Sequence, residues 1–341
     1  MVLPRVANEA LTNRPPTSAS APIVPADADG VASAARLLAR GGLVALPTET
    51  VYGLAADATN GEAVAAIFEA KGRPRFNPLI CHVDGRAMAR TIGRFTPLAE
   101  RLAEAFWPGP LTLVLPLAAE ARIHPLVTAG LDTVAVRMPA GIARDVIAAL
   151  GRPLAAPSAN RSGRISPTTA RAVAESLGER VDLIVDAGPA RVGLESTIVR
   201  IGDDALICLR PGGVPLAEIE AVAGMPVERA AADAEIAAPG MLRSHYAPDM
   251  PVRLNAAEVR PGEALLAFGP GAIDGADRAV AVANLSPAGD PAEAAANLFA
   301  MMAELNAARP SAIAVMPIPS DGLGEAINDR LARAAAPRHA S

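Results

Sequence analysis

The feature that most constrains this chain is a series of short apolar segments, each ending directly in a polar or a Gly/Pro-containing motif. Helical patterns at residues 27–42 and 61–72 alternate with them. Many short strands with polar ends predict one twisted α/β sheet whose loops gather along one side. The predicted strands cover residues 42–48, 77–83, 110–116, 132–139, 154–159, 182–188, 196–201 and 205–212.

The pattern changes after Gly213. Residues 214–248 begin with a short helical pattern and then lose periodicity, which predicts an interdomain linker. From Met250 the alternation returns, with strands at 252–256, 263–269, 279–285 and 311–319 and helices at 290–308 and 322–336. The sequence therefore predicts a disordered tail (1–26), a first α/β domain (27–213), a linker (214–248) and a second, smaller α/β domain (249–337).

Composition excludes several classes of protein. With 341 residues, 51% of them apolar, the chain has material for two domains with a substantial core. A net charge of −5 argues against a general nucleic-acid coat. Neither a membrane-spanning run nor a signal peptide is evident, so we expect a cytoplasmic protein. Cys81 and Cys208 lack metal-ligand spacing and are expected to be buried small hydrophobes in a reducing compartment.

Two polar loops follow predicted strands. LPTETVYGLAADA (46–58) gathers Thr48, Glu49, Thr50 and Tyr52, and APSANRSGRISPTTA (156–170) gathers serines around an Asn and a Gly. Such loops aim hydroxyl and backbone N–H groups at anionic oxygens. Each also has a structural alternative, because the first loop resembles a helix cap and SPTTARAV resembles a helix start with Ser166 as its N-cap.

Cationic residues stand beside proline-fixed turns. Arg137 in VAVRMP and Arg210 in LRPGG each end a predicted strand, and KGRPRFN carries Lys71, the only lysine of the chain, together with Arg73. Arginines in such places are better held than solvated surface arginines. A compact ammonium among so many guanidinium groups suggests a point charge for a phosphate oxygen.

The residues show no nucleophile and base pair, no P-loop and no zinc site. GPGAIDG (269–275) has the wrong glycine spacing for dinucleotide binding and is predicted to be a turn. Cations, hydroxyls and backbone amides suit chemistry in which the protein positions reactants and neutralises phosphate charge. Transfer of a nucleotidyl group from ATP with Mg²⁺ has these needs.

Taken in order, these segments resemble the YrdC-type threonylcarbamoyl-AMP synthase family. PTETVYGL, KGRPRFNPL, WPGPLTLVL, VAVRMP, APSANRSGRISPT, ESTIV and LRPGG carry the resemblance over residues 47–213. SHYAP (244–248) and GLGEAINDRLARAA (322–335) resemble the long two-domain form. The resemblance implies an α/β, twisted-sheet YrdC-like catalytic domain followed by a smaller Rossmann-like α/β domain.

The resemblance also implies a reaction and its partners. L-Threonine, bicarbonate and ATP, with Mg²⁺, would give L-threonylcarbamoyl-AMP and pyrophosphate. The product would enter the threonylcarbamoyl modification of the adenosine beside the anticodon of tRNA. A downstream transferase would perform that second step, and tRNA itself is a candidate partner.

Site residues follow by motif. The resemblance implies a catalytic group of Lys71, Arg73, Ser158 and Asn160. The implied ATP-binding residues are Arg73, Asn77, Thr133, Ser158, Ser166, Arg210 and Tyr246. The implied threonine-binding residues are Thr50, His82, Arg137, Ala156 and Ser196, and no protein ligand to a metal is assigned. A linker residue at the nucleotide implies that 214–248 forms a lid, so truncation near Gly213 is expected to leave a stable but weakly active fold.

Two alternatives stay open. One is an RNA-binding module, which the acidic balance and the 3% aromatic content disfavour. The other is a different carbamoyl-adenylate chemistry on the same fold, as in hydrogenase-maturation carbamoyltransferases, whose zinc-finger cysteines are absent here. Pyrophosphate release without RNA separates the enzyme from the binding module.

Overall fold

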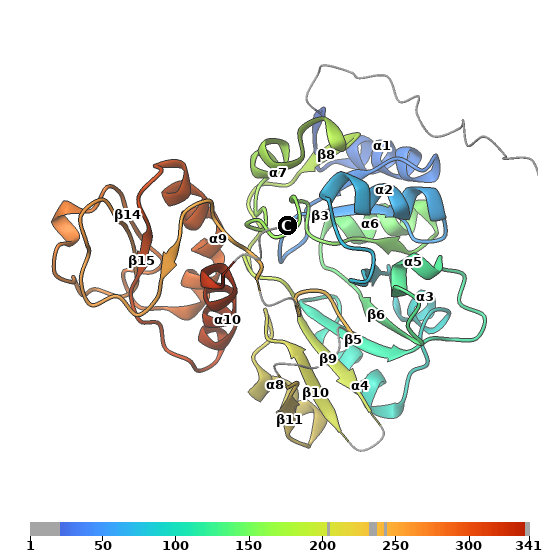
Figure 1. Ribbon diagram of the computed structural model, residues 1–341. Coiled ribbons are helices and arrows are strands. Elements are labelled where there is room, and N and C mark those ends of the chain that lie inside the picture. Colours follow the sequence, from blue (N-terminus) through green and yellow to red (C-terminus); the bar gives the residue numbers. More distant parts are fainter. Residues whose placement is uncertain (1–20, 203–204, 232–236, 242–243, 338–341) are drawn as a thin grey trace, which may run out of the picture.

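The chain folds into two lobes that lie side by side, joined by the linker (Figure 1). The computed structural model describes residues 21–202, 205–231, 237–241 and 244–337. The first lobe is built on an eleven-stranded sheet and the second on a four-stranded sheet. The α/β fold class and the two-domain organisation agree with the sequence.

The large sheet has the order β1-β8-β2-β3-β7-β4-β6-β5-β9-β10-β11 and mixes parallel with antiparallel pairs. Its strands are β1 (Ile23–Pro25), β2 (Val44–Leu46), β3 (Gly53–Asp57), β4 (Ile80–His82), β5 (Leu111–Pro116), β6 (Thr133–Arg137), β7 (Leu154–Ala155), β8 (Leu183–Asp186), β9 (Thr197–Ile201), β10 (Leu206–Arg210) and β11 (Val227–Arg229).

Helices cover both faces of this sheet. They are α1 (Ala28–Ala39), α2 (Gly61–Lys71), α3 (Arg86–Arg90), α4 (Pro97–Phe106), α5 (Pro125–Thr128), α6 (Ile142–Leu150), α7 (Ala170–Leu177) and α8 (Leu216–Ala223). Alternate residues of one strand enter different cores: Ala45 of β2 packs in a cluster with Ile67 of α2, whereas Val44 packs with Leu38 of α1 and Val146 of α6. The sheet is therefore a buried central layer.

The second lobe contains a small parallel sheet with the order β12-β15-β13-β14. Its elements are β12 (Val252–Arg253), β13 (Ala264–Ala267), β14 (Val282–Asn284), α9 (Pro291–Ala307), β15 (Ile313–Val315) and α10 (Leu323–Ala335). GPGAIDG lies in the connection between β13 and β14 and forms no long helix, as expected.

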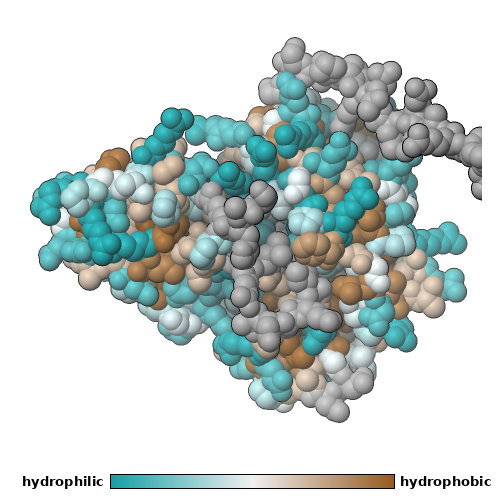
Figure 2. Space-filling model, viewed as in Figure 1, coloured by the Kyte–Doolittle hydropathy of each residue, from teal (hydrophilic) through white to brown (hydrophobic). Residues whose placement is uncertain are grey.

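The surface view shows hydrophobic patches broken up by hydrophilic side chains on the visible face (Figure 2). Among the described residues, no helix combines the length and apolar character that a membrane crossing requires. Cys81 and Cys208 are buried, as predicted, and burial raises the pKa of both thiols to about 12.

Two predicted boundaries are wrong. Residues 21–26 are not tail, because β1 pairs in parallel with β8; residues 1–20 lie outside the described part of the chain. The linker is shorter than predicted, because β11 pairs with β10 and α8 contributes Leu216 and Ile219 to the first core. A cut near Gly213 would remove core residues, so the stable fragment predicted there is not expected.

The prediction also misses β3. The TETVYG turn is followed by this strand and not by a helix, so it is no helix cap. All five residues of β3 are buried, and the Leu-Ala-Ala run lacks the alternation that signals a strand.

The two lobes meet along a tightly packed seam. Val51 and Leu194 of the first domain belong to the same apolar cluster as Phe299 of α9 and Leu331 of α10. At Gly193, φ is +73° and a Cβ atom would lie 2.4 Å from the carbonyl oxygen of Ala295. This contact has no room for a side chain.

We expect Gly193→Ala to loosen the docking of the second domain. Backbone strain costs about 1–2 kcal/mol at a left-handed position, and the contact with α9 adds overpacking. Small-angle X-ray scattering and limited proteolysis between the domains should report the separation.

Gly188→Ala is the matched control, since its φ of +79° is similar but a Cβ there meets nothing within 4 Å. Equal effects of the two substitutions would contradict the proposed tight seam.

Candidate active site

A cavity lies where several strands of the large sheet end or begin. His82 ends β4, Arg137 ends β6 and Arg210 ends β10, while Ser196 immediately precedes β9. Because β9 is antiparallel to β10, the start of one strand lies beside the end of the other. Strand topology thus brings residues from distant parts of the sequence to one place. This agrees with the prediction that the polar ends of the strands lie along one side of the sheet.

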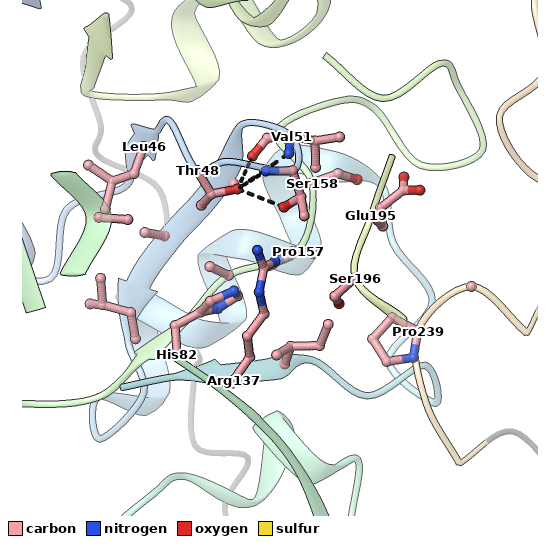
Figure 3. A pocket seen from close by; sticks show the side chains of 18 of the residues that line it. Leu46, Thr48, Val51, His82, Arg137, Pro157, Ser158, Glu195, Ser196 and Pro239 are labelled. Carbon is pink, nitrogen blue, oxygen red and sulfur yellow. Dashed lines mark hydrogen bonds between the residues drawn. The ribbon is translucent and has the colours of Figure 1, made fainter. Parts of the chain in front are cut away.

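One half of the cavity is built around Arg137 and His82, which are register partners on neighbouring parallel strands. Both side chains point into the centre of the close view (Figure 3). Arg137 donates through Nε to the carbonyl of Gly109 (3.1 Å), and its Nη2 lies 2.8 Å from Oε1 of Glu49. Both side chains of this ion pair are almost fully buried. Glu49 thus fixes the guanidinium that faces the cavity.

His82 is a neutral hydrogen-bonding group. Burial, and then the charge of Arg137, lower its pKa to about 3. Its Nδ1 atom is buried and has no hydrogen-bond partner within the described chain. A buried polar atom without a partner is rare and favours a ligand contact.

Hydroxyl groups complete this half. The Oγ atoms of Thr48 and Thr50 lie 2.7 Å apart, and the Thr48 hydroxyl donates to the carbonyl of Val51 at 2.6 Å (Figure 3). The Ser196 Oγ lies 2.7 Å from the Oγ1 of the fully buried Thr112. Ala156 follows β7 and lines the same wall. The group offers one guanidinium, one imidazole and several hydroxyls to a small zwitterion.

The other half carries positive charge that forms no ion pair with the described residues. Arg73 donates to the carbonyls of Asn77 (3.2 Å) and Pro78 (2.7 Å). Arg210 donates to the carbonyls of Ser196 (2.9 Å) and Pro239 (3.4 Å).

Lys71 donates to two further carbonyls, those of Ser158 and Asn160. In the part of the chain that the structure describes, none of the three cations forms an ion pair. Burial, followed by the charge of Arg210, lowers the pKa of Arg73 to about 9. Burial also lowers the pKa values of Lys71 and Arg210. Buried cations held by neutral carbonyl and hydroxyl oxygens favour an anionic ligand.

Lys71 does not line the cavity wall. Its side chain is 3% exposed and lies behind the loop that carries Ser158 and Asn160. The ammonium therefore holds the Ser158–Asn160 loop and adds positive charge behind it. The sequence had predicted that this ammonium faces the phosphates. Ser158 does line the cavity.

The linker closes the cavity. Pro239, Gly240, His245 and Tyr246 line it, and Tyr246 is 1% exposed. The Tyr246 ring stacks on Phe299 of α9 with centroids 5.5 Å apart. Its backbone has a left-handed φ of 62°, which is strained for a residue other than glycine. The predicted contact of Tyr246 with the site is thus present in the geometry.

Four further predicted residues do not line the cavity: Asn77, Thr133, Asn160 and Ser166. Asn77 and Asn160 lie close behind it and have buried side-chain amide atoms without partners. Thr133 begins β6, about 13 Å along the strand from Arg137 at ~3.3 Å per residue, so the structure does not bring it to this cavity.

Ser166 has a different role from the predicted N-cap. The N-cap of α7 is Thr169, whose side chain accepts from the Ala172 amide. The Ser166 hydroxyl instead donates to Oε1 of Glu195 at 2.6 Å, and Glu195 lines the cavity. Burial raises the pKa of Glu195, but Arg330, Arg210 and Ser166 outweigh it and hold the value at about 2.

Comparison with known proteins agrees with this geometry. A family model for Sua5, YciO and YrdC proteins, described as "Telomere recombination", matches residues 36–212. The chain belongs to the Sua5/YciO/YrdC family. A second model, described as "Threonylcarbamoyl-AMP synthase, C-terminal domain", matches residues 214–336. The resemblance inferred from the motifs is confirmed.

Two curated relatives match about two thirds of this chain. The chain is 48% identical over 229 residues to a Bacillus subtilis protein named threonylcarbamoyl-AMP synthase, covering 66% of each chain. It is 49% identical over 226 residues to a Pyrococcus abyssi protein of the same name, covering 64% of this chain and 66% of the relative. These alignments span just under two thirds of the relatives' length.

A solved structure matches more of the chain. The crystal structure of P. abyssi Sua5 complexed with L-threonine has a TM-score of 0.84 and 38% identity, and the match covers 94% of this chain and 98% of that one. A P. abyssi Sua5 variant in which an adjacent His and Tyr are replaced by Ala matches with a TM-score of 0.81, 37% identity and coverage of 89% and 92%.

Sequence reasoning missed several residues of the site. Thr112, Glu195, His245 and Arg330 received no role, although Glu195 and His245 stand inside motifs that were recognised, ESTIV and SHYAP. Each of these two residues stands beside a residue that was assigned to the site, Ser196 or Tyr246, and this adjacency could have pointed to them. Arg330 also stands inside a recognised segment, GLGEAINDRLARAA, but its partner Glu195 is 135 positions away in sequence, so the pairing could not be predicted.

We expect the stability of the fold to fall as the pH is lowered from about 6.5. His82 and His245 have pKa values of about 3 in the folded chain, against 6.5 for the ordinary group. Between these values the unfolded chain binds protons that the folded chain does not. At pH 5 each histidine therefore costs roughly 2 kcal/mol.

Urea unfolding of the wild type and of His82→Gln at a series of pH values tests this. The free energy of unfolding of His82→Gln should fall less than that of the wild type between pH 6.5 and 5. Above pH 7.5 the two chains should show the same pH dependence. Parallel pH profiles would contradict a neutral buried His82.

Proposed function

We propose that the chain synthesises L-threonylcarbamoyl-AMP from L-threonine, bicarbonate and ATP, and releases pyrophosphate. The observation that carries the proposal is the joining of two half-sites in one closed cavity. One half offers Arg137, neutral His82 and hydroxyls, and the other offers buried cations that form no ion pair with the described residues. The name of the relatives and the threonine reported in the P. abyssi structure support the same reaction.

Threonine fits the half-site built on Arg137. A guanidinium held by Glu49 and Gly109 is oriented to bind the carboxylate. His82, being neutral, accepts a hydrogen bond from the amino group or the side-chain hydroxyl. Ser196 and Thr50 satisfy the remaining polar atoms, and Ala156 leaves room for the methyl group.

The proposed chemistry has two steps. The amino nitrogen of threonine forms a bond to the carbon of bicarbonate, and water is lost, giving N-carboxythreonine. A carboxylate oxygen of this new group then attacks the α-phosphorus of ATP. The bond from that phosphorus to the bridging oxygen breaks, and pyrophosphate leaves.

Positive charge stabilises the second step. Negative charge increases on the α-phosphate and on the leaving pyrophosphate, and Arg73 and Arg210 line the cavity without an ion pair to any described carboxylate. Lys71 adds a third charge and fixes the carbonyls of Ser158 and Asn160. Such fixed charges act strongly in a closed, dry site.

Magnesium is proposed to arrive with ATP. Among the described residues there is no group of three or more His, Cys, Asp or Glu side chains arranged to hold a metal ion. The carboxylates at the cavity, Glu49 and Glu195, are engaged by Arg137 and Arg330. The ion would therefore be held by phosphate oxygens and water, which are its usual ligands.

The linker is proposed to protect the product. A mixed anhydride hydrolyses readily, and four residues of the linker line the cavity: Pro239, Gly240, His245 and Tyr246. The chain has one His-Tyr pair, His245–Tyr246, matching in type the pair replaced in the P. abyssi variant. We assign this pair to the lid.

The product would supply the threonylcarbamoyl modification of tRNA. A downstream transferase would take the group to adenosine, with tRNA as a candidate partner at that stage. The proposal includes a cytoplasmic location, which the two buried, unpaired cysteines support.

The decisive experiment measures pyrophosphate release from ATP, L-threonine and bicarbonate in the absence of RNA. We expect release only when all three substrates are present, with threonylcarbamoyl-AMP detected by mass spectrometry. Absence of release, together with tight binding of RNA, would favour the binding module instead.

We expect Lys71→Arg to reduce kcat/KM on the order of 10²-fold while the chain still folds. The Nζ atom is fully buried between two carbonyls, and a guanidinium is larger and demands a planar fork. The Ser158–Asn160 loop would therefore shift into the cavity. Steady-state kinetics and circular dichroism measure both properties.

Arg75→Met is the matched control, because this exposed cation lies in the segment that follows α2, four residues after Lys71. It should leave kcat/KM near the wild-type value. Near wild-type turnover of Lys71→Arg would show that the ammonium has no special role.

A further inference from the structure

A buried arginine of the second domain reaches the wall of the proposed active site. Arg330 lies on α10 and has no exposed surface. Its Nε donates to Oε2 of Glu195 at 2.8 Å, and its Nη1 donates to Asp329 at 2.6 Å. This contact joins the two domains at a residue that lines the cavity.

The Glu195 carboxylate lies close to two arginines, Arg330 of the second domain and Arg210 of the cavity wall. Glu195 immediately precedes Ser196. Its backbone is held in place because the Gly213 amide donates to the Glu195 carbonyl at 3.0 Å. Its carboxylate interacts electrostatically with both Arg330 and Arg210. Without Arg330, the Glu195 carboxylate would interact more strongly with Arg210, whose hydrogen-bond partners among the described residues are carbonyls and the Ser196 hydroxyl.

Arg330 also contacts the linker. Its guanidinium carbon lies 5.2 Å from the centre of the Tyr246 ring, within the range of cation–π contacts. The same ring stacks on Phe299 of α9. Arg330 therefore links Glu195, on the cavity wall, with Tyr246, on the lid.

One atom of Arg330 is left without a partner. Its Nη2 is buried and makes no hydrogen bond with any described residue. A purely structural arginine buried to this degree is expected to use its full donor set. This side chain is placed for the charge of Glu195 and the face of Tyr246.

We propose that Arg330 is a positioning residue of the active site, which binds Glu195 and thereby leaves Arg210 available for the phosphates of ATP. The proposal rests on the proposed function. Arg330 itself lies outside the cavity lining. The second domain thus contributes charge balance to a site formed by the first.

Arg330→Met should raise the KM for ATP roughly 10- to 100-fold, the value of one charge-assisted contact. The KM for threonine should change far less, because Arg137 and His82 belong to the other half-site. Pyrophosphate release measured against each substrate gives the two constants.

The decisive variant is the double replacement Arg330→Met with Glu195→Gln. The glutamine carbonyl still accepts from Ser166 but carries no charge, so Arg210 is free again. We expect the KM for ATP to return to within about threefold of wild type, whereas a merely structural loss at Arg330 would persist. This variant also decides the question if Arg330→Met alone does not fold.

Glu325→Gln is the matched control. Glu325 lies on the same helix and pairs with Arg229 of the first domain at 2.7 Å, but at the surface. This second interdomain ion pair should be dispensable for both KM values. An equal rise in the KM for ATP in Glu325→Gln would overturn the proposal in favour of general docking.

The two proposals fail in different ways. If the wild type releases no pyrophosphate with threonine, bicarbonate and ATP, the proposed function fails. If the wild type is active and Arg330→Met keeps its KM for ATP, or the double variant shows no recovery, the role of Arg330 is refuted and the function stands.

Discussion

Positive charge held by backbone carbonyls is the constraint on which the site depends. Lys71, Arg73 and Arg210 are buried, and their donors are directed to carbonyl oxygens. Carbonyl dipoles offset only part of the cost of burying a charge. The fold supplies the remainder through an eleven-stranded sheet with both faces covered. Stability gained far from the cavity thus maintains an electrostatic state that favours a polyanion.

The charged side chains around the cavity are of two kinds, those in ion pairs and those without one among the described residues. Arg137 has Glu49, and Glu195 has Arg330. These pairs fix the geometry of the wall, whereas Arg73 and Arg210 line the cavity without an ion pair to any described residue. Parallel pairing of β4 with β6 sets His82 beside Arg137, and the antiparallel β9 and β10 set Ser196 beside Arg210. The division of labour follows from strand direction.

The sequence could predict those parts of the fold in which local pattern and tertiary role coincide. Arg137 and Arg210 end buried strands before a proline, and both were placed correctly.

β3 was missed because its alanines are buried on both faces. Ser166 was misread because Thr169, three residues later, caps the helix. Lys71 was recognised by rarity, but only the structure shows that it faces carbonyls. β1 and Arg330 escaped because their partners lie more than 130 positions away.

The left-handed backbone of Tyr246 makes closure of the cavity a conditional state. A φ of 62° costs about 1–2 kcal/mol, so the linker does not hold this shape by itself. It is secured from both sides: the Ala247 amide donates to Gly163 of the first domain, and the His245 amide donates to Arg333 of the second. Separation of the domains removes one anchor and lets the tyrosine relax. The closed shape of the linker therefore depends on both domains together, and the strain at Tyr246 is sustained only while they are docked.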